Sequence, residues 1–429
     1  MNYFRQIYYE MKHQRMMTWV SISGTALAIF LVMAVIMADR INTVEVSPES
    51  NRGRILKCGG FNVNFEDGRS WSGMPYTFSF AKQLYEGIEG IDRISFKLSR
   101  GGQKGWVRLK GGATHNTTRL EVDNEFWNIY DFKFIDGRPY DAAEVASNAK
   151  LVVITQSLAR SLFGEDKVSG REIYYGDIPY KVIGVVEDVN PLLSNTYAEV
   201  FKLYSPAFVR ENDRYIGDSE VIMLMSPGVT AEEIKSRVKE RFMKVQPQFA
   251  KEGMTLIYNE QPCTAAEQEF LPGDQPERDL ASKKQRNLIM FAILLLLPAI
   301  NLGSLTRGRL RHRVSEIGVR RAFGATRSSI VRQIFGENLV ITLLGGLIGL
   351  VVSFLFMKYL FHLFFNFSGY FGPSSLAISH ATPDFSMLFT WDNFLLALLF
   401  CFVLNTLSAT VPAWRASGVE PAEAISFSH

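Results

Sequence analysis

The sequence predicts an α-helical membrane protein with four transmembrane helices and a large α+β external domain between the first two. Hydrophobic residues make up 47% of the 429 residues and are distributed unevenly. They are concentrated in four runs: 16–38, 288–306, 338–361 and 393–413. Each run approaches the roughly 20 residues needed to cross a bilayer. Residues 39–287 are mixed and polar, and an arginine-rich segment joins the second run to the third.

The first 15 residues are predicted to be cytoplasmic. They contain Arg5, Lys12, His13 and Arg15 against one acid, Glu10, and basic flanks are retained on the cytoplasmic side. Residues 16–38 carry no charge and form a longer apolar run than a typical signal peptide has. A removed signal sequence is the alternative.

Two parts of the external segment have the same strand–helix–strand pattern. The first is predicted at 54–64, 78–91 and 93–98, and the second at 220–225, 230–245 and 254–258. The helix over 230–245 has an N-cap at Thr230 and Glu233 three residues later, which is a capping box. We therefore expect a small α+β subdomain built from 39–103 and 197–287.

The middle of this segment, 104–196, is predicted to be a β-rich insert. Strands are expected at 106–110, 132–134, 151–154, 172–175 and 180–186, with one helix at 157–163. Cys58 and Cys263 lie near the two ends of the external segment, and a disulfide between them is possible in an oxidising compartment.

Residues 307–337 are predicted to be a cytoplasmic segment. Up to residue 335 it contains one acid, Glu316, and these arginines: Arg307, Arg309, Arg311, Arg313, Arg320, Arg321, Arg327 and Arg332. A short loop so rich in arginine stays on the cytoplasmic side. Apolar residues at helical spacing predict an amphipathic helix from Val314 that stops at Gly324. Thr326 is then expected to cap the helix that enters the third span.

Small residues in the predicted spans indicate close helix packing. Gly24 and Ala28 lie four residues apart in the first span, as do Gly345 and Gly349 in the third. Asn301 in the second span needs a polar partner in lipid, so we expect it to face another helix; contact with a substrate is the alternative.

The rest of the chain completes the topology. Residues 362–392 are predicted to be an external loop, and 414–429 a cytoplasmic tail beginning near Arg415. Both ends of the chain are then cytoplasmic. A net charge of +3 gives no indication of nucleic-acid binding.

No catalytic or metal site is predicted. The sequence has no GxxxxGK[ST] loop, HExxH or GxSxG motif, and its histidines have no cysteine or carboxylate partners at ligand spacing. We expect no cofactor in this chain.

The run EIGVRRAFGAT at 316–326 resembles the coupling segment of MacB/FtsX-type ABC transporter permeases. The series FIDGR at 134–138, LFG at 162–164 and VIGVVED at 182–188 resembles the periplasmic core domain of that family, and 412–425 resembles its C-terminal signature. The resemblance covers nearly the whole chain. It implies that 39–103 and 197–287 form a porter-like part.

The resemblance also implies function and partners. ATPase contact would be made by Glu316, Ile317, Gly318, Arg320, Arg321, Gly324 and Ala325. The family implies a dimer of permease subunits in the bacterial inner membrane, with two cytoplasmic ABC ATPase subunits that bind ATP and Mg. It also implies a cargo such as a lipoprotein, peptide or antibiotic, and an optional periplasmic adaptor or outer-membrane partner.

Three alternatives remain at this point. The amphipathic helix can instead bind anionic lipid only. The whole protein can be a membrane-anchored periplasmic sensor or scaffold, or a divisome-type signalling permease that moves no cargo.

Overall fold

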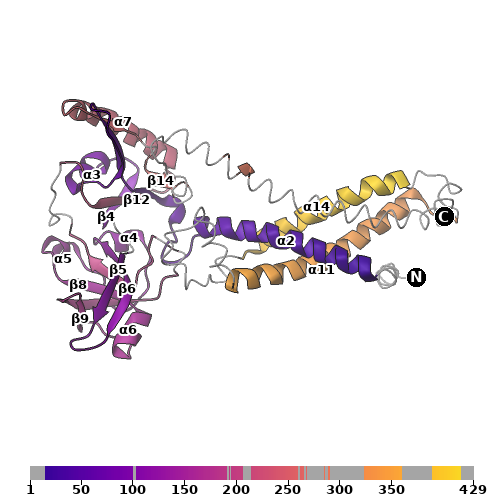
Figure 1. Ribbon diagram of the computed structural model, residues 1–429, viewed down its shortest axis with the longest axis horizontal. Helices are drawn as coiled ribbons and strands as arrows, with labels where there is room; N and C mark the ends of the chain where they lie inside the picture. The colour runs from indigo at the N-terminus through magenta and orange to yellow at the C-terminus, as the bar shows by residue number, and fades with distance from the viewer. Residues whose placement is uncertain are drawn as a thin grey trace. The chain divides into compact units, whose positions relative to one another are not determined.

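The computed structural model describes residues 15–99, 103–190, 193, 195–205, 214–258, 261–264, 267, 285, 288–289, 323–359 and 389–416. These residues belong to two compact units, a helical one and the external domain, which begins after Arg40 (Figure 1). Most of the predicted second span 288–306, the expected amphipathic helix up to residue 322 and nearly all of the loop 362–392 lie outside the described residues.

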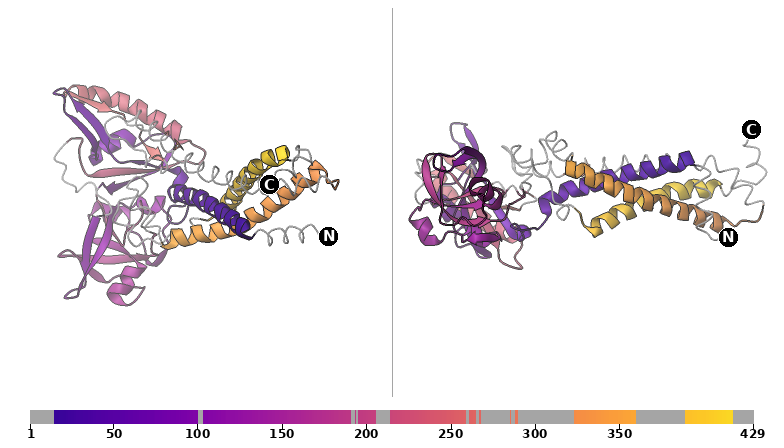
Figure 2. Two further views of the ribbon diagram at one scale, coloured as in Figure 1. Left: turned by 45° about the vertical axis from the view of Figure 1, so that its right-hand side comes forward. Right: turned by 90° about the horizontal axis from the view of Figure 1, so that it is seen from below.

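The helical unit contains α2 (Arg15–Thr43), α11 (Arg327–Tyr359) and α14 (Trp391–Ala416), which lie alongside one another (Figure 2). They coincide with three of the four predicted spans. Among the described residues, the stretch Phe335–Phe356 is long and apolar enough to cross a membrane, and Thr18–Ala34 and Trp391–Val403 are shorter apolar helical stretches.

The start of α11 agrees with the predicted cap. Thr326 immediately precedes the first residue of α11, and its Oγ1 accepts a hydrogen bond from the Ser329 amide at 3.3 Å. Gly324 has φ +90°, a backbone conformation that glycine adopts without the penalty imposed by a Cβ.

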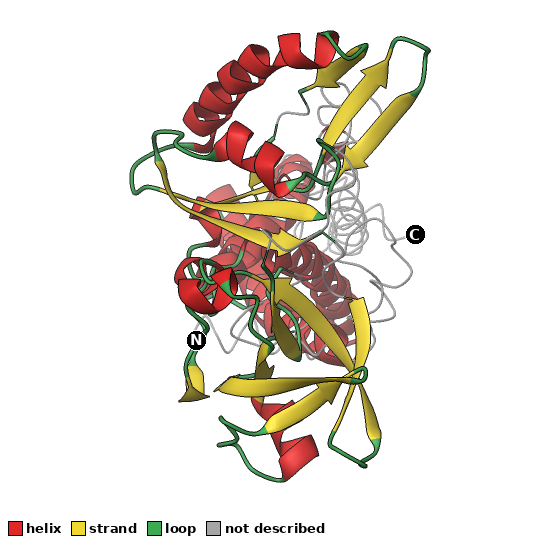
Figure 3. Ribbon diagram, turned by 90° about the vertical axis from the view of Figure 1, so that its left-hand side faces the viewer, coloured by secondary structure: helices red, strands yellow, loops and turns green. Residues whose placement is uncertain are grey.

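Among the described residues of the external domain, one end of an 11-stranded sheet has the order β4-β12-β1-β14 and is here called the first sheet. Its strands are β4 (Ile91–Leu98), β12 (Ser219–Met225), β1 (Ile55–Cys58) and β14 (Cys263–Thr264), all antiparallel. Helices α3 (Phe78–Tyr85) and α7 (Ala231–Ala250) lie beside these strands (Figure 3). They contribute to one apolar core with alternate residues of β1 and β12. The predicted α+β subdomain made from distant parts of the chain is therefore present.

A second, three-stranded sheet contains β2 (Phe61–Phe65), β3 (Ser70–Met74) and β13 (Met254–Ile257). The prediction of a single strand at 54–64 was wrong. The strand is interrupted at Gly59 and Gly60, and the two parts, β1 and β2, belong to different sheets. A Cβ at Gly60 would lie 2.7 Å from the Met74 carbonyl oxygen, so glycine is required for this crossing. The predicted helix 78–91 was too long, since α3 ends at Tyr85 and Gly87 has φ +72°.

The insert folds as a closed ring of strands, here called the β-ring. Its members are β5 (Gln103–Arg108), β6 (Thr114–Val122), β8 (Leu151–Thr155), β9 (Glu172–Tyr175), β10 (Ile178–Val186) and β11 (Val200–Leu203). The pairing β6-β11-β8-β10-β9-β5 returns to β6, so no edge of these strands is left open. The β-ring also includes β11, which begins at Val200, after residue 196, where the insert was predicted to end.

Short elements surround the β-ring. They are η1 (Arg52–Arg54), α4 (Phe126–Ile129), β7 (Phe134–Gly137), α5 (Ala142–Ala146) and α6 (Gln156–Phe163). The strand predicted at 132–134 begins only at Phe134, where β7 pairs with β10. Lys97 of β4 pairs with Val122 of β6, which links the β-ring to the first sheet.

The capping box of α7 is confirmed. The Thr230 side chain accepts from the Glu233 amide at 3.4 Å, and the Glu233 carboxylate accepts from the Thr230 amide at 3.3 Å. We expect Thr230→Ala to destabilise the external domain by about 1 kcal/mol, because the Glu233 amide loses its acceptor. Chemical denaturation monitored by circular dichroism measures this, and Thr230→Ser should retain wild-type stability. Equal loss in both variants would contradict the cap.

Candidate functional site

Most of the predicted ATPase-coupling residues lie outside the described part of the chain. These are Glu316, Ile317, Gly318, Arg320 and Arg321. Gly324 and Ala325 are described and lie between Phe323, which is 88% exposed, and the start of α11. The role of this segment as the contact with an ATPase stays a prediction.

The predicted glycines of α11 lie against α2. A Cβ at Gly345 would be 2.8 Å from the Thr25 Cβ, and a Cβ at Gly349 would be 2.6 Å from the Ala26 carbonyl oxygen. Only a residue without a side chain permits the backbones to approach this closely. On α2, Gly24 and Ala28 are both buried.

Other contacts of the helical unit were not predicted. A Cβ at Gly346 would lie 2.9 Å from Leu398 Cδ1 of α14, so this glycine admits a second helix. Phe30 and Phe356 contact edge to face, with ring centroids 5.2 Å apart. Asn301 lies outside the described residues.

The chain between α2 and β1, residues 44–54, is here called the exit segment. It is attached first to Asp131, which follows α4. Ser47 Oγ donates to the Asp131 carbonyl oxygen at 3.0 Å, and the Asp131 amide donates to the Pro48 carbonyl oxygen at 3.0 Å. The Ser50 amide donates to Asp131 Oδ1 at 3.3 Å. This attachment joins the exit segment to the chain that leads into β7.

A buried carboxylate makes the second attachment. Glu49 is 1% exposed and accepts from Thr196 Oγ1 at 3.0 Å and Asn195 Nδ2 at 3.4 Å. It also forms an ion pair with Arg52 Nε at 3.4 Å. Two hydrogen-bond donors and one guanidinium therefore surround one buried carboxylate, as a buried ion requires.

Arg54 makes the third attachment. Its Nη2 and Nε donate to the Met225 carbonyl oxygen at 2.6 and 3.0 Å, at the end of β12. The exit segment is thus bonded to the α4–β7 connection, to the chain before β11 and to the first sheet.

Charged residues occupy the sheet face that lies opposite the apolar core. Lys57 of β1 is 5% exposed, and its Nζ has no hydrogen-bond partner among the described residues. Burial lowers the pKa of Lys57 to about 7, although the charge of Glu49 acts in the opposite direction. Lys97 and Glu220 pair across β4 and β12 at 2.8 Å.

Asp123 lies over the same sheet face. Burial raises the pKa of Asp123 to about 6, against hydrogen bonds from Ser95 Oγ at 2.6 Å and the Phe96 amide at 2.7 Å. Sequence reasoning did not identify these buried charges, because an isolated lysine or acid in a strand normally indicates an exposed side chain.

Cys58 and Cys263 are free thiols, both buried on neighbouring strands. The residue paired with Cys263 is Lys57, so the two cysteines are one position out of register. Burial raises the pKa of Cys58 well above its ordinary value, which keeps the thiol protonated and unreactive. The possible disulfide is not formed in this structure.

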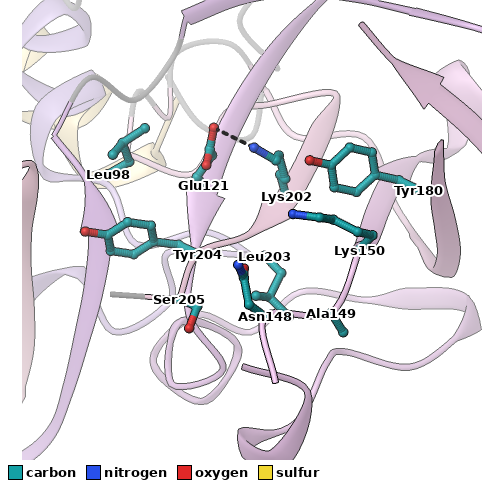
Figure 4. A pocket seen from close by; sticks show the side chains of 10 residues that line it. All are labelled: Leu98, Glu121, Asn148, Ala149, Lys150, Tyr180, Lys202, Leu203, Tyr204 and Ser205. Carbon is teal, nitrogen blue, oxygen red and sulfur yellow. Dashed lines mark ion pairs between the residues drawn. The ribbon is translucent and has the colours of Figure 1, made fainter. Parts of the chain in front are cut away.

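A small open cavity of about 210 Å³ lies beside the β-ring (Figure 4). Its lining includes Glu121 and Lys202, which form an ion pair at 3.2 Å, together with Lys150 and Tyr180. With two ammonium groups against one carboxylate, the cavity favours a small anionic group over a cationic one. Among the described residues, no group of three His, Cys, Asp or Glu side chains can hold a metal ion.

Two family models match the chain in succession. The model described as MacB-like periplasmic core domain matches residues 18–241, and the model described as FtsX-like permease C-terminal matches residues 288–421. The first spans α2 and most of the external domain, and the second spans α11 and α14.

Similar sequences agree with these matches. The "Uncharacterized ABC transporter permease YknZ" of Bacillus subtilis is 24% identical over 349 residues, which cover 80% of this chain and 77% of that protein. The "Macrolide export ATP-binding/permease protein MacB 2" of Aeromonas hydrophila is 23% identical over 439 residues, covering 98% of this chain and 60% of that protein. The chain thus spans only part of that relative.

A solved structure of the periplasmic region of MacB from Actinobacillus actinomycetemcomitans is 15% identical and covers 48% of this chain and 90% of that one, with a TM-score of 0.35. Since one family model alone matches more than half of the residues, the chain belongs to the MacB/FtsX-type ABC transporter permeases, membrane proteins with a large α+β periplasmic domain.

Proposed function

We propose that this permease transmits the ATP-driven movement of a separate cytoplasmic ATPase to its periplasmic domain, and thereby extrudes or extracts a cargo such as a lipoprotein, peptide or antibiotic. The observation that carries the proposal is the order of the two matches, periplasmic core first and FtsX-like permease second, with an arginine-rich cytoplasmic segment between spans of the second. The printed name of the Aeromonas relative joins ATP-binding and permease functions in one protein. Here the printed sequence has no phosphate-binding loop, so ATP and Mg would be bound by a partner chain.

The proposed assembly follows from the charge pattern and the family. The chain crosses the bacterial inner membrane four times with both ends in the cytoplasm. Two permease copies, or one copy and a paralogue, form a dimer above two ATPase subunits. A periplasmic adaptor or outer-membrane protein is an additional proposed partner.

Glu316, Arg320 and Arg321 are proposed to make charge-assisted hydrogen bonds to the ATPase. We expect the double variant Glu316→Gln/Arg320→Gln to reduce permease-stimulated ATP hydrolysis at least tenfold in a reconstituted complex with the ATPase that copurifies with the chain. Each such bond contributes on the order of 1.5 to 3 kcal/mol, and 1.4 kcal/mol corresponds to a factor of ten.

The matched control is Arg415→Gln/Glu420→Gln in the predicted cytoplasmic tail, which also removes one charge of each sign. It should leave stimulation unchanged. Undiminished stimulation in the Glu316/Arg320 variant, with normal assembly, would reject the coupling role. Failure of any ABC ATPase to copurify with the wild-type chain would reject the proposed function itself.

A further inference from the structure

We infer that the exit segment, residues 44–54, is the joint through which a displacement of α2 reaches the β-ring and the first sheet together, and that Glu49 is its positioning residue. This inference rests on the proposed function, because it assumes that α2 moves. It adds the residues that carry the movement into the external domain.

The exit segment is not a slack linker. It connects Thr43, the last residue of α2, to Ile55, the first residue of β1. Short unpaired connections of this kind normally run over the surface with high mobility. Here Val44, Glu49 and Arg52 are 6%, 1% and 6% exposed, so the segment is partly interior.

Its attachments come from three distant stretches of the chain. Ser47 bonds to a residue 84 positions away, Glu49 to one 147 positions away, and Arg54 to one 171 positions away. The first two partners belong to the chain that enters and leaves the β-ring, and the third is the end of β12. A displacement of the exit segment therefore acts on both structural parts.

Of the exit-segment residues that make these attachments, Glu49 has the most partners in the described part of the chain. Its carboxylate is buried and holds Thr196, Asn195 and Arg52 at once. Removing one member of a buried hydrogen-bonded charge group leaves the others without partners, which favours local opening over a rigid connection. With Glu49 absent, Arg54 still attaches the segment to β12 and Asp131 still attaches it to the α4–β7 connection, but both hydrogen bonds to the chain before β11 are lost. The β-ring then keeps the Asp131 attachment and its pairing with β4, so it should follow α2 less closely than the first sheet does.

The test measures movement directly. Spin labels are placed on the full chain in complex with its ATPase, in two pairs: Ser23→Cys with Lys244→Cys, and Ser23→Cys with Lys167→Cys. All three positions are exposed, on α2, on α7 and near the β-ring, whereas Cys58, Cys263 and Cys401 are buried. Distances are compared without nucleotide and after trapping with ATP and vanadate.

In the wild type we expect both distances to change on trapping. In Glu49→Ala we expect the nucleotide-dependent distance change of the Lys167 pair to fall by at least half. The distance change of the Lys244 pair and the rate of ATP hydrolysis should stay near their wild-type values. Thr196→Val removes the shorter of the two hydrogen bonds to Glu49 from the other side and should reduce the change for the Lys167 pair in the same direction. Should Glu49→Ala fail to fold, Thr196→Val carries the test alone.

Glu45→Ala is the matched control. Glu45 is an exposed carboxylate of the same segment whose bond, to the Gly53 amide at 2.9 Å, stays within the segment. It should behave as the wild type. If the distance changes in both Glu49→Ala and Thr196→Val equal those of the wild type, the exit segment is not the joint, but the proposed function is unaffected. No nucleotide-dependent change in the wild type itself would remove both.

Discussion

Replacing Gly349 with leucine is expected to break the contact between α2 and α11 and to destabilise the helical unit by roughly 3 kcal/mol or more. A Cβ at this position would lie 2.6 Å from the Ala26 carbonyl oxygen and 3.1 Å from the Ile29 Cβ. Neither atom is the free end of a flexible side chain, so relief requires the two helices to separate. Separation also exposes Ile29, which is fully buried.

The measurement is the midpoint of thermal or detergent-induced unfolding of the purified chain. The unfolding midpoint of Gly349→Ala should lie between those of the wild type and Gly349→Leu, because the alanine Cβ alone already comes too close to the Ala26 carbonyl oxygen. Ile348→Leu, one residue away and 41% exposed, is the control and should remain near wild type. Wild-type stability of Gly349→Leu would contradict the close approach of these helices.

Replacing Lys57 with methionine is expected to stabilise the external domain, by up to about 5 kcal/mol below pH 7. The pKa of Lys57 falls from 10.5 to about 7 on folding, and each unit corresponds to ~1.4 kcal/mol. Methionine fills a similar volume without a charge that needs a partner, and in the described part of the chain the Lys57 Nζ has no hydrogen-bond partner.

The sign of the pH dependence follows from this lowered pKa. Between pH 7 and 10.5 the unfolded chain binds a proton at Lys57 that the folded chain releases, so raising the pH favours the folded wild type. The advantage of Lys57→Met should therefore be complete below pH 7 and shrink steadily towards pH 10. Denaturation of both proteins at pH 6.5, 8 and 9.5 measures it.

Lys104→Met, on the exposed side of β5, is the control for loss of a lysine and should stay within about 0.5 kcal/mol of wild type. A constant difference between Lys57→Met and wild type across this pH range would show that Lys57 does not lose its proton on folding.

Local patterns in the sequence were sufficient for the helices and the family. Apolar runs located α2, α11 and α14, because the length needed to cross a bilayer is a property of the chain itself. Thr326 and Thr230 were correctly predicted as N-caps, since a cap involves residues only three positions apart. The run at 316–326 and the ordered series in the external segment led to the family that both matched models support.

The closure of the β-ring could not be predicted from local sequence patterns. Strand β6 reads Thr-His-Asn-Thr-Thr-Arg-Leu-Glu-Val, which is too polar to predict a strand, and it closes the ring by pairing with β11 about 80 residues later. The break between β1 and β2 was missed for a related reason. Gly60 matters only because the Met74 backbone approaches it from another strand.

By itself, then, the sequence determined the family, the apolar helices α2, α11 and α14 and two N-caps, because each depends on local motifs, on hydrophobic length or on neighbours within a few residues. Tertiary structure alone decided which charges are interior. Glu49, Arg52 and Lys57 look like ordinary exposed residues in the sequence. They are buried because partners such as Thr196 and the strand β12 are brought to them from more than 140 residues away. Pairing over such distances leaves no periodic signal, so these buried charges became visible only in three dimensions.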